Sequence, residues 1–232
     1  AVPPYHDVVM VSFMMFHNEA RNWAKTAKSE GGYGGYKVLY QALVQSMCPD
    51  LQFNAEARRD MMALRHKLYG DFDLPDNLRH HTTPSVAFHI RRTDKLWSES
   101  DFYPAERYVD QLIQQVDKTN DDVTTLEICF LPTVHGELQQ ALTAAGMSCR
   151  LVYTPVSAYY GDNANPDDRY SVQAGLVFLT EFSILLETTY LVGIFGSNVV
   201  ALAAVLRGCQ DSNHHLHFAN TYGVDKPNWY FR

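Results

Sequence analysis

Strand-like and helix-like segments alternate along this chain from Ser85 onward, and this alternation restricts the possible folds more than any other feature. Apolar runs that resemble strands occupy residues 86–91, 125–131, 149–153 and 190–195, with a possible last strand at 216–219. Helix-like segments separate them at residues 104–117, 136–145, 171–187 and 197–207. Such alternation is typical of a parallel sheet with helices on both faces. The sequence therefore predicts an α/β fold with a doubly wound parallel sheet.

Residues with known preferences for helix ends support these segments. Pro104 suits a first helical turn, where its missing N–H costs no hydrogen bond, and Ser197 is a good N-cap. Gly146 and Gly208 are expected just past two helix ends, where glycine adopts the left-handed conformation easily.

The region before this alternation has a different pattern. It is interpreted as helical and irregular, with plausible helices at 36–47 and 54–68. The glycine-rich stretch 31–35 lacks the strand-to-helix context and the Gly-Lys-Ser/Thr ending of a P-loop. With 232 residues, of which 46% are apolar, the chain can bury one good core. We therefore expect an N-terminal segment at 1–82 and one α/β domain at 83–232.

A charged turn follows the first predicted strand. Because side chains alternate along a strand, His89 and Arg91 are expected to project from the same face, opposite Phe88. The run 89–95 reads His-Ile-Arg-Arg-Thr-Asp-Lys, and guanidinium groups match phosphate oxygens two at a time. The run is interpreted as a diphosphate-binding turn. The alternative is a solvated charged loop with weak internal salt bridges.

The expected topology brings this turn close to other segments. Doubly wound sheets bind ligands beyond the carboxyl ends of their strands, where the connections change faces. The segments expected to converge there are 91–99, 131–135, 154–158 and 195–198. The last is a helix N-terminus, whose free amides and Ser197 hydroxyl can hold a phosphate. Phosphate binding is therefore favoured over the salt-bridged loop.

Net charge and hydropathy narrow the class of partner. The chain has 19 Lys and Arg against 26 Asp and Glu, a net charge of −7, which disfavours nucleic acid as a partner. No apolar run approaches the length of a membrane span, and no signal peptide is visible at Ala1. We therefore expect no membrane contact by these residues.

The residues that commonly bind metals do not form a recognisable pattern. The four cysteines have no Cys-x-x-Cys spacing, which disfavours a zinc site and leaves a disulfide undecided. Cys129 and Cys149 lie in predicted buried strands, where free thiols behave as small hydrophobes. The histidines at 80–81 and 214–217 are interpreted as surface residues. The acidic pairs 121–122 and 167–168 are interpreted as loop or cap residues, with metal binding as the alternative.

The run 89–95, continued by Glu99, Phe102 and Pro104, resembles the signature of the α1,6-fucosyltransferases, a branch of the GDP-fucose-dependent fucosyltransferases. Segments 169–171 and 190–198 follow in the family's order, with the family's Phe-Ser-Ser-Gln present here as Phe-Gly-Ser-Asn. The resemblance is good over 86–205 and weaker over 36–68. It implies a Rossmann-like, GT-B-type donor-binding half of an enzyme that moves fucose from GDP-fucose to a core N-glycan or chitooligosaccharide.

The resemblance implies a diphosphate site on particular residues. Arg91 corresponds to the family's diphosphate contact, and Arg92 assists it or orients the turn. Ser197 and Asn198 match the family's phosphate-binding Ser and Gln, and Asn198 has the shorter reach by one methylene group.

The resemblance also implies a guanine end of the donor site. His89 corresponds to the residue nearest the nucleoside. Glu181 falls where the family has a guanine-binding Asp, although a mid-helix Glu that is simply exposed is the alternative.

For catalysis, the resemblance implies an inverting transfer in which a base deprotonates the acceptor hydroxyl while cationic groups stabilise the departing GDP. Glu99 aligns with the family's candidate base and Lys95 with its partner, and Arg91 serves the leaving diphosphate. Asp94 is expected to hold the arginines in place. Because guanidinium and amide donors can take the role of a divalent ion, neither a metal nor another cofactor is expected.

The chain departs from the family at several points. Residues 131–133 read Leu-Pro-Thr where the family has an acidic pair, and Trp97 lies in what is a glycine-containing turn in the family. The segment 1–82 is too short for the other nucleotide-binding-like half of the family enzymes, so either the sequence is a trimmed piece of a longer enzyme or the protein is a minimal or degenerate relative. The alternative function is therefore a noncatalytic module that binds a GDP-sugar or a glycan. For a eukaryotic source, the lumenal members of the family imply the Golgi or another part of the secretory pathway as the location.

Overall fold

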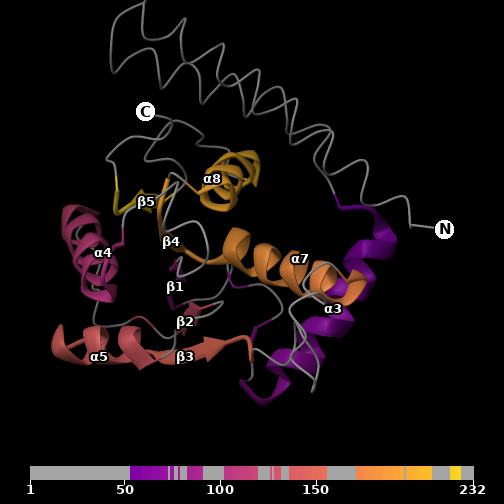
Figure 1. Ribbon diagram of the computed structural model, residues 1–232, viewed down its shortest axis with the longest axis horizontal. Helices are drawn as coiled ribbons and strands as arrows, with labels where there is room; N and C mark the ends of the chain where they lie inside the picture. The colour runs from indigo at the N-terminus through magenta and orange to yellow at the C-terminus, as the bar shows by residue number, and fades with distance from the viewer. Residues whose placement is uncertain are drawn as a thin grey trace, which may run out of the picture.

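The computed structural model describes residues 53–72, 74–75, 78, 83–90, 102–119, 126, 128–131, 136–155, 171–195, 197–210 and 220–225 (Figure 1). Within these residues, a β-sheet lies between two groups of helices. Helices α4 (Ala105–Thr119) and α5 (Gly136–Ala144) lie on one side. On the other side lie α3 (Ala55–Tyr69), α7 (Val172–Glu187) and α8 (Asn198–Gln210).

In the described part of the chain, the sheet has five strands in the order β3-β2-β1-β4-β5, and every neighbouring pair is parallel. The strands are β1 (Ser85–His89), β2 (Ile128–Leu131), β3 (Arg150–Tyr153), β4 (Tyr190–Gly193) and β5 (Thr221–Gly223). The chain moves outward from β1 to β3 and then returns to the opposite side of β1 as β4. This reversal creates a topological switch point between β1 and β4.

The two faces of the sheet belong to two separate apolar cores. Val86, Phe88 and Ile90 lie in the core that includes α4 and α5, whereas Ala87 lies in the core that includes α3, α7 and α8. The predicted alternation of side chains along the first strand is therefore confirmed.

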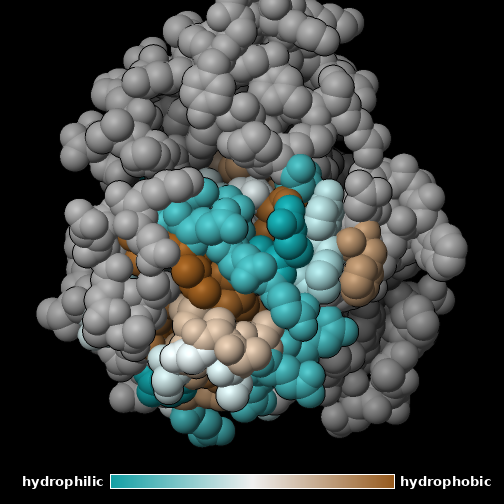
Figure 2. Space-filling view, turned by 90° about the vertical axis from the view of Figure 1, so that its left-hand side faces the viewer, coloured by the Kyte–Doolittle hydropathy of each residue, from teal (hydrophilic) through white to brown (hydrophobic). Residues whose placement is uncertain are grey.

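Helix α4 shows how the sequence pattern produces a surface helix. Its buried residues recur every three or four positions and are Ala105, Tyr108, Val109, Leu112 and Val116. Glu106, Arg107 and Asp110 between them are exposed. Figure 2 views this side of the molecule, where hydrophilic residues cover much of the described surface.

The structure confirms the predicted α/β class, with element ends that shift by a few residues. Gly146 has a φ of 71° after α5, and Met147 N donates to Leu142 O at 2.9 Å, as expected of a left-handed cap. The prediction for Gly208 is wrong because α8 continues through it to Gln210. Burial of Leu206 and Arg207 in the same turn outweighs the cost of a helical glycine, about 1 kcal/mol.

Several elements predicted near the two ends of the chain are not among the described residues. The last strand among the described residues is β5 at 221–223, whereas the predicted range 216–219 lies outside them. The predicted helix 36–47 and the glycine-rich stretch 31–35 also lie outside them. None of the helices in the described ranges has the length and apolar character needed to cross a membrane.

Helix α3 packs against α7, although it precedes the regular alternation of strands and helices. Asn54 caps α3 by accepting a hydrogen bond from Ala57 N at 2.7 Å, which confirms the helix predicted at 54–68. Arg65 is buried and donates to Glu187 Oε2 at 2.8 Å and to Pro75 O at 2.6 Å. This guanidinium ties α3 to the C-terminal end of α7, and the short 3-10 helix η1 (Gly70–Phe72) follows.

A second buried arginine ties α8 to the end of α7. Arg207 is 2% exposed, and its Nη1 donates to Leu185 O at 2.8 Å and to Thr188 O at 2.6 Å. Its Nη2 donates to Thr189 O at 2.9 Å. Carbonyl groups at a helix C-terminus lack intrahelical donors and favour a positive charge. Arg207 therefore provides hydrogen-bond donors and a positive charge to the carbonyl groups at the C-terminal end of α7.

The amino ends of β1 and β4 are joined by a reciprocal pair of hydrogen bonds. Ser85 N donates to Thr189 Oγ1 at 3.1 Å, and Thr189 N donates to Ser85 Oγ at 3.2 Å. The pair fixes the relative position of two strands whose first residues are far apart in the sequence.

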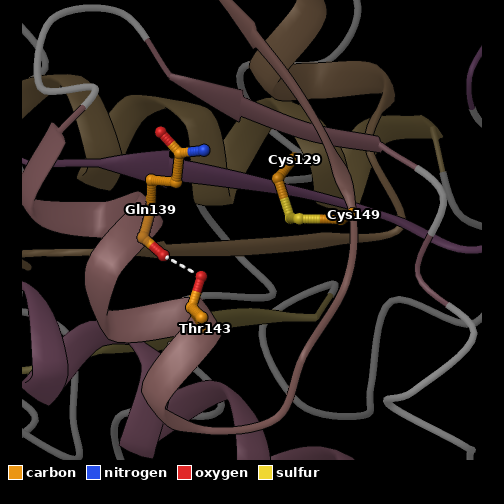
Figure 3. Close-up of a disulfide and its surroundings, with 4 residues drawn as sticks. All are labelled: Cys129, Gln139, Thr143 and Cys149. Atoms are coloured by element: carbon orange, nitrogen blue, oxygen red, sulfur yellow. Dashed lines mark hydrogen bonds between the residues drawn. A yellow bond between two sulfur atoms is a disulfide. The ribbon is translucent and has the colours of Figure 1, made fainter.

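Cys129 and Cys149 form a disulfide, with their Cα atoms 5.8 Å apart (Figure 3). The sequence left a disulfide undecided, and the structure shows that these two cysteines are paired rather than free buried thiols. Cys129 lies in β2 and Cys149 directly precedes β3, so the bridge closes the unit β2-α5-β3. Gln139 and Thr143 of α5 lie nearby, joined by a hydrogen bond from Thr143 Oγ1 to Gln139 O. Cys209 is also disulfide-bonded.

Candidate functional site

The carboxyl ends of β1 and β4 lie side by side at the switch point. His89 ends β1 and is paired in register with Gly193, the last residue of β4. A Cβ atom added to Gly193 would lie 2.6 Å from Cγ2 of Val200 and 3.4 Å from Cβ of His89. Glycine is therefore needed at this position for the first turn of α8 to approach the sheet this closely.

We expect Gly193→Ala to lower the free energy of unfolding by about 1–3 kcal/mol, because the new methyl group overlaps the buried, β-branched Val200. Gly175→Ala is the matched control. Gly175 lies in α7 with no atom within 4 Å of an added Cβ, so alanine should stabilise the helix by about 0.5–1 kcal/mol. Urea denaturation measures both values, and effects of the same sign would contradict the close approach of α8.

The turn between β4 and α8 presents a helix N-terminus at the same edge of the sheet. Ser197 N donates to Ile194 O at 2.8 Å, and Ser197 O accepts from Ala201 N at 3.0 Å. Ser197 is buried, and Asn198 is the first residue of α8, which confirms the predicted helix start to within one residue. Amide groups in a first helical turn have no intrahelical acceptor and favour anions.

Strand β5 contributes an acidic side chain to this edge. Val224 N donates to Gly193 O at 2.9 Å, and Asp225 Oδ1 accepts from Phe195 N at 2.8 Å. These bonds join the end of β5 to the β4–α8 turn, of which residues 194, 195 and 197 are described. No sequence pattern indicated Asp225, because it lies 30 residues from Phe195 and follows a strand of only three residues.

A buried carboxylate lies on the α7 side of the sheet. Glu181 is 3% exposed, so the interpretation of an exposed mid-helix Glu is wrong. Its neighbours Thr180 and Phe182 are buried too, and α3 packs on this helix. An ionised carboxylate is costly to bury, and such groups are common at functional sites.

Tyr69 and Thr154 form a buried polar pair close to Glu181. Tyr69 ends α3, Thr154 follows β3, and their hydroxyl oxygens are 2.6 Å apart in a hydrogen bond. Burial raises the pKa of the Tyr69 phenol well above its usual value, and the negative charge of Glu181 raises this pKa further. Sequence patterns did not reveal this pair, because its members are 85 residues apart.

The predicted site residues divide into two sets. His89, Ser197 and Asn198 lie at the switch point, as expected, and Glu181 lies in the middle of α7. The predicted residues that lie outside the described part of the chain are Arg91, Arg92, Asp94, Lys95 and Glu99.

The residues considered earlier as metal ligands cannot be placed. The acidic pairs 121–122 and 167–168, and the histidines at 80–81 and 214–217, lie outside the described residues. Among the described residues, no group of three or more His, Cys, Asp or Glu side chains is close enough together to hold a metal ion.

An all-parallel sheet in the order β3-β2-β1-β4-β5, covered by helices on both faces, defines a Rossmann-like α/β domain, a class that binds ligands at its switch point. The profile of the alpha-(1,6)-fucosyltransferase N- and catalytic domains matches residues 60–221, and the chain belongs to this family. It is thus a member of a glycosyltransferase family, which confirms the resemblance seen in the sequence. A search of curated proteins finds no match to the chain.

Proposed function

We propose that this chain transfers fucose from GDP-fucose to a glycan acceptor, with inversion at the anomeric carbon and without a divalent metal. The observation that carries the proposal is the family match over 60–221, which includes the switch point between β1 and β4. Membership in a fucosyltransferase family implies a nucleotide-sugar donor and a glycan acceptor.

The donor diphosphate is assigned to the switch point. The start of α8 supplies amide donors, and Ser197 directly precedes it. Arg91 and Arg92 follow β1 in the sequence, and β1 is the strand paired with β4. Guanidinium and amide donors can neutralise the charge on departing GDP, the role that a divalent ion has in other glycosyltransferases.

The guanine base is assigned to His89 and Glu181. Guanine presents N–H donors on the edge that pairs with cytosine, and an ionised carboxylate can only accept hydrogen bonds. The burial of Glu181 supports this assignment, because hydrogen bonds to a carboxylate are stronger in a buried environment than in water.

The transfer itself requires one base and one stabilised leaving group. The acceptor oxygen attacks the anomeric carbon of fucose, its proton passes to the Glu99 carboxylate, and the bond from that carbon to the β-phosphate oxygen breaks. The electron pair of the broken bond remains on GDP, where Arg91 and the α8 amides stabilise the added charge. Lys95 pairs with Glu99, and Asp94 orients the two arginines.

The proposed location is the secretory pathway, and within it the Golgi lumen. Disulfides form and persist in oxidising compartments. The Cys129–Cys149 bridge, together with the disulfide of Cys209, supports such a location.

We expect GDP to bind the wild type in excess chelator and Arg91→Ala to weaken this binding by about 1.5–3 kcal/mol, roughly tenfold or more. The reason is the loss of a charged donor to the diphosphate. Arg91→Lys should recover only part of the loss, because an ammonium group lacks the two-pronged geometry. Titration calorimetry measures all three affinities, with Arg59→Ala on the exposed surface of α3 as the control.

Two outcomes would contradict these assignments. Loss of all GDP binding upon chelation would exclude the metal-independent mechanism. An affinity of Arg91→Ala equal to that of the wild type would remove Arg91 from the diphosphate site.

One observation favours a second candidate function, a noncatalytic module that binds a GDP-sugar or a glycan. Residues 131–133 read Leu-Pro-Thr where the family that the sequence resembles has an acidic pair, and loss of those carboxylates would remove contacts to the ribose or acceptor. GDP binding without transfer to any acceptor would favour this function.

A further inference from the structure

We propose that Asp225 is a positioning residue for the donor diphosphate, because its carboxylate fixes the β4–α8 turn that presents Ser197 and the first amides of α8. This inference rests on the proposed function. Its basis is the hydrogen bond from Phe195 N to Asp225 Oδ1 at 2.8 Å.

Phe195 is the point at which the chain leaves the sheet and turns into α8. Gly193 is still paired with β1 through His89, and its carbonyl oxygen accepts from Val224 N of the β5 end. Two residues later, the acceptor for Phe195 N is the side chain of Asp225 rather than a neighbouring strand. A buried backbone N–H requires an acceptor, so Asp225 determines where the turn lies.

A hydrogen bond and close packing join the β4–α8 turn to the start of α8. Ser197 N bonds back to Ile194 O, so Ile194, Phe195 and Ser197 form one compact unit. Val200 in the first turn of α8 packs against Gly193, which leaves little room for independent movement of the helix. A displacement of Phe195 N therefore shifts Ser197 and the α8 amides relative to His89.

The charge of Asp225 and its hydrogen bond have opposite effects on an anionic donor. A carboxylate near a diphosphate repels it, whereas a carboxylate that accepts from the turn holds the phosphate donors in place. Asparagine keeps an acceptor oxygen and removes the negative charge, and alanine removes both. The two substitutions therefore separate positioning from charge.

Calorimetry with GDP on the full chain tests the inference. We expect Asp225→Ala to weaken GDP binding roughly tenfold, and Asp225→Asn to recover most of that loss or to bind GDP more tightly than the wild type. Asp110→Ala on the exposed face of α4 is the control with unchanged affinity. In the Ser197→Ala background, Asp225→Ala should cost less than in the wild type, because both changes act on one contact.

Hydrogen exchange provides a readout that does not depend on GDP. The Phe195 amide should exchange at least about tenfold faster in Asp225→Ala than in the wild type and stay protected in Asp225→Asn. Global unfolding would instead raise the exchange rates of the β1 and β4 amides as much as that of the Phe195 amide. If Asp225→Ala does not fold, the Asp225→Asn variant still tests the positioning role. Weak GDP binding by folded Asp225→Asn would overturn that role.

The possible failures are distinguishable. Wild-type affinity in Asp225→Ala, or equally weak binding by the Ala and Asn variants, overturns this inference and leaves the proposed function intact. Absence of GDP binding by the wild type overturns the proposed function and this inference with it.

Discussion

Fucose transfer by the Glu99→Gln variant should fall by about 10² to 10⁴ relative to the wild type. Glutamine keeps the size of the side chain and its capacity to form hydrogen bonds, but it cannot take the proton of the acceptor hydroxyl. The affinity for GDP should barely change, because Glu99 is assigned to the acceptor and not to the donor. A large loss of rate without a loss of donor binding is the result expected of a general base.

The measurement requires folded protein, saturating donor, and a panel of core N-glycan and chitooligosaccharide acceptors. Glu106→Gln is the control, since Glu106 is exposed on α4 a few residues further along the chain. A misfolded variant would lose GDP binding and transfer together. Equal activity of Glu99→Gln and the wild type would remove Glu99 from the mechanism, and a wild type that binds GDP but transfers to no acceptor would favour the noncatalytic function.

The largest effect on stability is expected for Arg207→Leu, which should lower the free energy of unfolding by about 3–5 kcal/mol. Leucine keeps part of the apolar stem but provides no donor for the carbonyl oxygens of Leu185, Thr188 and Thr189. Without the guanidinium group, these carbonyl oxygens at the end of α7 would lose a charged donor in a region to which water has little access. Urea denaturation followed by circular dichroism measures the change.

Two further variants define the cause of that effect. Arg207→Lys should recover part of the stability, because an ammonium group keeps the charge but reaches fewer acceptors. Arg59→Leu should change stability by less than about 0.5 kcal/mol, since Arg59 is exposed and its ion pair with the neighbouring Asp60 lies at the surface. A loss for Arg207→Leu as small as that for Arg59→Leu would show that the buried network is not needed.

The sequence was most informative where structure depends on local pattern. The spacing of Tyr108, Leu112 and Val116 is enough to predict α4, since a helix of this kind needs only one apolar face. The alternation around Phe88 likewise predicts β1 and the two faces of the sheet. The position of strand β5 was not predicted from such a pattern, because three residues are too few to show a periodicity.

The candidate site was predicted only in part, for a related physical reason. Topological rules place His89 and Ser197 at the same edge, because both follow from the order of strands and helices. The bond between Tyr69 and Thr154 and that between Asp225 and Phe195 connect distant segments through single side chains. Such contacts depend on the final packing and leave no periodic trace in the sequence. The same applies to the disulfide, because cysteine spacing alone does not define pairing.

The ties at the amino ends of the strands have a consequence for engineering the acceptor preference. Arg207 acts on the chain that leads into β4, Ser85 and Thr189 join the beginnings of β1 and β4, and Cys149 directly precedes β3. None of these ties uses a residue from 91–101, 132–135 or 156–170, the segments that follow β1, β2 and β3. Libraries randomised at 132–135 and 156–170, with the proposed catalytic residues of 91–101 kept, would therefore sample new specificities without removing these ties at the opposite edge, and most of their members should still fold.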